Sequence, residues 1–94
     1  MSAQQVARLR QRAAHLRDFA ARMERTPALK LGDRAGVDTW RGPKAHGCEA
    51  DLHRYRQRIH AEADGLRTQA WLFEQRAAEI EAADAARLAA QGVV

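Results

Sequence analysis

The stretch Asp38-Thr39-Trp40-Arg41-Gly42-Pro43 decides the fold of this chain, because it interrupts two long helix-forming segments. Glycine tolerates backbone conformations that are closed to other residues, and proline is well suited to the first position of a helix. A large apolar ring directly before them can anchor a reversal of the chain. We therefore predict a bend at Trp40, Gly42 and Pro43, with one helix before it and another after it.

The composition indicates an all-α protein with a single domain over residues 1–94. Alanine and arginine dominate the 94 residues, and aromatic residues make up only 5%. Strong helix formers are therefore abundant, whereas residues that favour strands are scarce. A chain of this length buries only about 60 to 65% of its unfolded surface. Its stability margin is thin, and a partner would add to it.

The segment before the bend has the periodicity of a short helix over about residues 3–25. Steps of three and four residues separate its apolar positions, as in a heptad repeat; the stripe, widened by Phe19, comprises Val6, Leu9, Ala13, Leu16, Ala20 and Met23. Thr26 precedes Pro27, and a residue before proline disfavours the helical conformation. The helix is expected to end there, and residues 26–43 form the linker and bend.

The segment after the bend predicts a long helix over about residues 44–88, with a frayed tail at 89–94. Its stripe comprises Leu52, Tyr55, Ile59, Ala63, Leu66, Ala70, Phe73, Ala77, Ile80, Asp84 and Leu88. Alanines at positions 13, 20, 63, 70 and 77 permit close approach of two helices but fill little volume. The two helices are expected to form an antiparallel helix-turn-helix hairpin.

The first helix is too short to cover the second, and an uncovered apolar face of that size predicts a partner. We expect two hairpins to pair into a four-helix bundle, as a homodimer or as a heterodimer with a paralogous chain. The expected interface comprises Leu9, Leu16, Phe19, Leu52, Tyr55, Ile59, Leu66, Phe73 and Ile80.

A charge gradient along the chain favours the antiparallel arrangement. Residues 1–30 carry a net charge of +5, residues 31–60 carry +2, and residues 61–94 carry −3. In a hairpin, the arginines at positions 8, 10 and 12 are expected to face the acidic residues Glu74, Glu79, Glu81 and Asp84. Exposed ion pairs contribute little stability, so the gradient mainly sets the orientation.

A helix, a Trp-x-Gly bend and a long helix within 94 residues resemble the WXG-motif family, the early-secreted-antigen-like small proteins of type VII secretion in actinobacteria. Trp40 and Gly42 carry the motif, and the architecture extends the resemblance over nearly the whole chain. The resemblance implies a type VII secretion substrate or the partner of one. Its expected partners are a paralogous WXG-like protein and the secretion machinery, which would recognise a surface that includes the bend.

The chain departs from this family in two respects. Family partners often carry a Tyr-x-x-x-Asp/Glu export signal after the second helix, whereas Tyr55 here is followed four residues later by Ile59, and no other position matches. The first helix is also short for the family. The chain looks like the signal-lacking member of a pair or a divergent non-secreted relative. We expect it to be secreted without a cleaved signal peptide, or to be cytoplasmic before export.

Other kinds of site find less support in the sequence. The spacing of His46, Cys48, His53 and His60 fits no known zinc site, so we expect no metal, with Cys48 as a small residue beside Leu52. The chain shows no arrangement of nucleophile and base and no phosphate-binding glycine loop. We therefore expect no enzyme activity, no catalytic residue, no cofactor and no small-molecule substrate.

A second hypothesis is a basic cytoplasmic helical module that binds nucleic acid or regulates a complex. Arg54, Arg56 and Arg58 motivate it, but alternate residues of a helix point to different sides and no aromatic platform accompanies them. Stable membrane insertion is not expected, because no apolar run approaches the roughly 20 residues of a membrane span.

Overall fold

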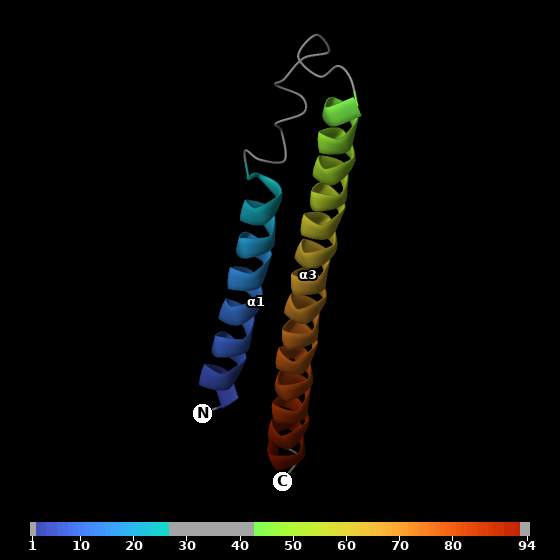
Figure 1. Ribbon diagram of the computed structural model, residues 1–94. Helices are drawn as coiled ribbons and strands as arrows, with labels where there is room; N and C mark the ends of the chain where they lie inside the picture. Colours follow the sequence, from blue (N-terminus) through green and yellow to red (C-terminus); the bar gives the residue numbers. More distant parts are fainter. Residues whose placement is uncertain (1, 27–42, 93–94) are drawn as a thin grey trace.

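The structure is a computed structural model that describes residues 2–26 and 43–92, the side chains of 43–46 excepted. Two helices, α1 (Ser2–Glu24) and α3 (Pro43–Gly92), are its elements. They lie side by side and antiparallel, with the start of α1 and the end of α3 at the same end of the hairpin (Figure 1). The predicted all-helical hairpin is confirmed for the described residues. Trp40 and Gly42 of the predicted bend lie outside them.

The helix ends agree closely with the local sequence signals. Helix α1 ends at Glu24, and the next two backbone N–H groups, of Arg25 and Thr26, still donate to carbonyls of its last turn. The Thr26 hydroxyl also donates to the Arg22 carbonyl at 3.3 Å. These bonds satisfy carbonyls that a helix end otherwise leaves unpaired. Helix α3 begins at Pro43, as expected of a proline that needs no N–H partner in the first turn.

The C-terminal end of α3 differs from the prediction. The helix continues to Gly92, so residues 89–92, which were expected to belong to a frayed tail, are helical. The physical reason is that Leu88-Ala89-Ala90-Gln91 consists of good helix formers, and the first glycine that can end the helix comes only after them. Residues 93 and 94 lie outside the described part of the chain.

Among the described residues, the buried core of the hairpin consists of small residues only. On α1 it comprises Val6, Ala13 and Ala20, and on α3 it comprises Ala63, Ala70 and Ala77. Each series repeats every seven residues, which is the period that keeps one face of a helix against its neighbour. Since each alanine buries little more than one methyl group, worth about 0.8 kcal/mol, this core supplies little apolar stabilisation.

The two helices differ in length, and this mismatch leaves part of α3 beyond the reach of α1. Helix α1 has 23 residues and α3 has 50. Helix α1 lies along the C-terminal part of α3, because Glu24 at its end contacts His60 and Arg67, and Arg10 near its start contacts Glu81. Helix α3 extends past the C-terminal end of α1 (Figure 1). Within the described ranges, neither helix has the length and apolar character needed to cross a membrane.

Candidate interaction surface

The position of the buried small residues divides the hairpin into two opposite faces. In an α-helix, the residue four places after a given one is rotated by about 40° and the residue three places after it by about 60° in the other direction. Because the helices are antiparallel, each of these positions falls on the same side of the hairpin in both helices. The side chains at the two positions are chemically different, so the two faces differ as well.

The ionic face is formed by the residues four places after the buried ones. Three pairs join the helices across this face: Arg10–Glu81, Arg17–Glu74 and Glu24–Arg67. Each step of seven residues forward on α1 is matched by a step of seven backward on α3. This register confirms the antiparallel heptad packing and the expected meeting of the basic start with the acidic end.

The geometry of the central pair is that of a forked contact. Arg17 donates from Nη2 to Oε1 of Glu74 at 2.5 Å and from Nε to Oε2 at 3.3 Å. The hydrogen bond from Arg17 lowers the pKa of Glu74 below its ordinary value. Both side chains remain about two-fifths exposed, so solvent screens the pair and its main effect is on register and direction.

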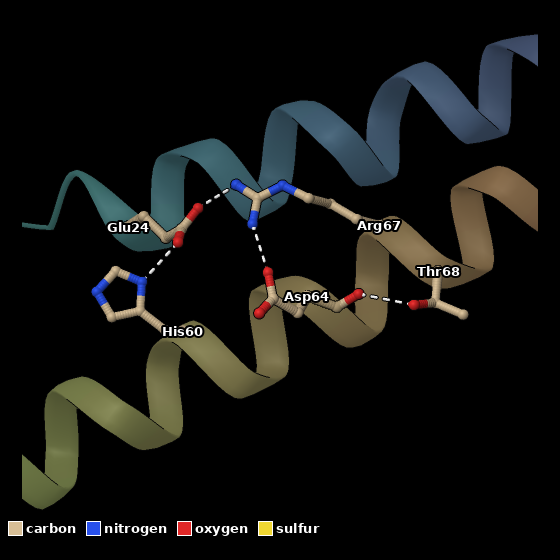
Figure 2. A network of polar contacts seen from close by, with 5 residues as sticks. All are labelled: Glu24, His60, Asp64, Arg67 and Thr68. Atoms are coloured by element: carbon tan, nitrogen blue, oxygen red, sulfur yellow. Dashed lines mark hydrogen bonds and ion pairs between the residues drawn. The ribbon is translucent and has the colours of Figure 1, made fainter.

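At the end of α1, Glu24 binds two groups of α3 (Figure 2). Arg67 donates to Oε1 of Glu24, and Nδ1 of His60 lies 2.5 Å from its Oε2. Arg67 also donates to Oδ1 of Asp64 at 3.0 Å, which holds its guanidinium in place. The hydrogen bonds from Arg67 and, to a smaller degree, His60 lower the pKa of Glu24. The carboxylate is therefore charged although it sits at the negative end of the α1 dipole.

The apolar face is formed by the residues three places after the buried ones, together with Phe19. Its members are Leu9, Leu16, Phe19 and Met23 on α1, and Leu66, Phe73 and Ile80 on α3. Phe19 is 57% exposed, and the others are half-buried. A shallow groove joins the two helices on this side and is lined by Phe19, Met23, Glu62, Gly65, Leu66 and Gln69. The largest aliphatic and aromatic side chains of both stripes thus remain partly in water.

The structure places the predicted interface residues in two groups. Seven of them lie on the apolar face or continue its seven-residue series along α3: Leu9, Leu16, Leu52, Ile59, Leu66, Phe73 and Ile80, all half-buried. Phe19 and Tyr55 are exposed, and Tyr55 lies on the part of α3 beyond α1. Leu88 is also exposed, so the stripe predicted from the sequence is not buried at its C-terminal end.

The charges pair across the helices as predicted only in part. Arg10 contacts Glu81 as expected, but Glu79 and Asp84 contact Arg76 and Arg87 of their own helix. The interhelical pairs of Arg17, Glu24 and Arg67 were not predicted. The signal that would have identified them is their position, each four residues after an alanine of the stripe.

The histidines and the cysteine are not gathered into a metal site. Among residues 2–26 and 43–92, no group of three or more His, Cys, Asp and Glu side chains is arranged to hold an ion. Cys48 is exposed rather than packed beside Leu52, because this part of α3 lies beyond α1.

Comparison with known proteins gave no relative: no protein-family model, no curated protein and no solved structure matched this chain.

Proposed function

We propose that this protein is a helical interaction module that pairs through its apolar face into a four-helix bundle. The observation that carries the proposal is the difference in burial between the two stripe positions. The small residues form the contact between α1 and α3, whereas the large ones at the neighbouring position are only half-buried. A hairpin built only for its own stability would bury the large side chains, because full burial of one such side chain is worth about 1.5 to 3 kcal/mol.

The ion pairs on the ionic face are a reason to place the partner on the apolar face. Its charges already satisfy one another across the two helices, so covering it would remove paired charges from water at a cost. The apolar face carries no such network, and its large side chains gain from being covered. A second pair of helices laid on the apolar face would complete a two-layer bundle with a common core.

The resemblance to the WXG-motif family supports a role for this pairing in type VII secretion. We propose that the chain is a type VII secretion substrate or the signal-lacking partner of one, acting together with a paralogous WXG-like protein or a second copy. The Trp40-x-Gly42 motif and the helical hairpin support this assignment. Export without a cleaved signal peptide, or residence in the cytoplasm before export, follows from the same proposal.

The test is native mass spectrometry of the full chain, alone and mixed with the protein encoded beside it. We expect a stoichiometric complex of two chains. Phe19→Glu should weaken it at least about tenfold, because a buried charge at the interface costs well over 1.4 kcal/mol. Leu72→Glu is the matched control. Leu72 is 54% exposed, a fraction similar to the 57% of Phe19, but it lies outside the apolar face.

A chain that stays monomeric alone and with its neighbour would overturn the proposal. Equal weakening by Phe19→Glu and Leu72→Glu would also overturn the choice of face. Both side chains are exposed in the hairpin, so circular dichroism should show an unchanged helix content for each variant.

A further inference from the structure

On α1, the edge of the apolar face carries a positive charge that has no ion-pair partner among residues 2–26 and 43–92. The edge positions are the residues directly before the buried ones, and on α1 they include Arg12. Neither Arg12 nor Arg8, which lies outside the edge positions, takes part in an ion pair among residues 2–26 and 43–92. The other arginines of α1 are all paired, Arg10 and Arg17 with α3 and Arg22 with Asp18.

On α3 the edge also offers no free acid. The edge positions there are Glu62, Gln69 and Arg76. Glu62 contacts Arg58 of its own helix at 3.5 Å, and Arg76 contacts only Glu79, also of its own helix, at 3.4 Å with both side chains more than 60% exposed. The described border of the apolar face is therefore basic on α1, and on α3 it carries Arg76 together with Glu62, whose charge is paired with Arg58.

From this border we infer that the occupant of the apolar face is a helical partner with acidic edges, in preference to a second copy of this chain. This inference rests on the proposed function and specifies its partner. Two identical hairpins can stack with α1 on α1, which brings the two α1 edges, each with an Arg12, into one seam. They can also stack with α1 on α3, which brings Arg12 to the edge that carries Arg76. Either arrangement opposes like charges.

The overall charge acts in the same direction. The chain carries a formal net charge of +4, so a homodimer doubles a positive charge, whereas an acidic partner neutralises it. Apolar burial supplies the affinity in either case. Complementary edge charges raise the association rate and disfavour the wrong partner.

The probe for this inference is a charge-reversed copy of the chain that carries Arg12→Glu and Arg76→Glu and retains the whole apolar face. Binding of fluorescently labelled wild-type chain to this copy and to unlabelled wild-type chain is measured by anisotropy at low and high salt. We expect the charge-reversed copy to bind at least about tenfold more tightly at low salt. The difference should shrink as salt screens the edges.

A control copy with Arg25→Glu and Arg54→Glu has the same formal net charge as the charge-reversed copy and therefore separates edge charge from net charge. These residues are exposed and are not edge positions of the apolar face. The control should bind the wild-type chain markedly less tightly than the charge-reversed copy does. Equal binding by the two copies would show that net charge alone decides and would overturn the inference.

Two further outcomes separate this inference from the proposed function. Tight wild-type self-association that Phe19→Glu abolishes would overturn the acidic partner while leaving the bundle intact. Absence of binding in every combination would overturn both, since the charge-reversed copy presents the same apolar face.

Discussion

Oε2 of Glu24 lies 2.5 Å from Nδ1 of His60, although 36 residues separate them in the chain. This contact and the hydrogen bond from Arg67 anchor the last residue of α1 to α3. The anchor matters because a carboxylate at a helix C-terminus opposes the helix dipole, so donors from the neighbouring helix compensate for its position. The end of α1 nearest the linker is therefore docked on α3 by polar contacts, beyond its last buried alanine.

The hairpin should lose stability in acid. The pKa values of Glu24 and Glu74 are lowered, chiefly by hydrogen bonds from Arg67 and Arg17 respectively. A lowered folded-state pKa means that the stabilisation is present above the ordinary glutamate pKa of about 4.3 and is lost as the pH falls through the folded-state value. Thermal melts followed by circular dichroism from neutral pH into this range should show the decline. The Glu24→Gln/Glu74→Gln variant should show a shallower one, and an equally steep decline in that variant would contradict the assignment.

A larger residue in the alanine core should destabilise the hairpin. Ala70 has no exposed surface, because its side chain packs against α1. Leucine is nearly as good a helix former as alanine, so Ala70→Leu isolates the effect of packing. We expect a loss of about 1 to 3 kcal/mol from overpacking, measured by urea unfolding. Ala78→Leu on the exposed surface of α3 should change the stability little, and an unchanged midpoint for Ala70→Leu would show that the helices have room to separate.

Replacement of Gly65 by alanine should stabilise the hairpin. Gly65 lies within α3, and a Cβ atom built on it meets nothing within 4 Å. Glycine in a helix interior costs roughly 0.5 to 1 kcal/mol relative to alanine. Gly65→Ala should raise the midpoint of urea unfolding by the equivalent of this amount. Gly92→Ala, at the last residue of α3, should have a smaller effect because that end has fewer helical bonds to lose.

The direction of the Arg17–Glu74 pair should be exchangeable. Arg17→Glu alone opposes two carboxylates, and Glu74→Arg alone opposes two guanidinium groups, so each should lower the thermal midpoint. The double exchange restores opposite charges at the same two positions and should recover most of the loss. Thermal melts at low and high salt provide the measurement, because salt should reduce all of these differences. Additive losses in the double variant would contradict the pairing.

Much of the fold follows from local sequence signals. The heptad spacing around Ala13 and Ala70, the Thr26-Pro27 stop and the Pro43 start were sufficient to predict two helices with nearly correct ends. The C-terminal end was predicted too early because no strong stop signal precedes Gly92, and helix propensity alone locates such an end poorly. Most of the ion pairs were missed because a net-charge gradient predicts direction and not individual partners.

For the part of the chain that the structure describes, the sequence by itself determined that there are two helices, that they run antiparallel, and that small and large apolar residues alternate along each stripe. Only the tertiary structure decided which of these residues pack between the helices. The heptad repeat places both alanine and leucine positions on one side of a helix, and periodicity alone does not choose between them. Close approach of α1 and α3 puts the alanines between the helices and rotates Leu16 and Phe73 to one side. That rotation creates the apolar face.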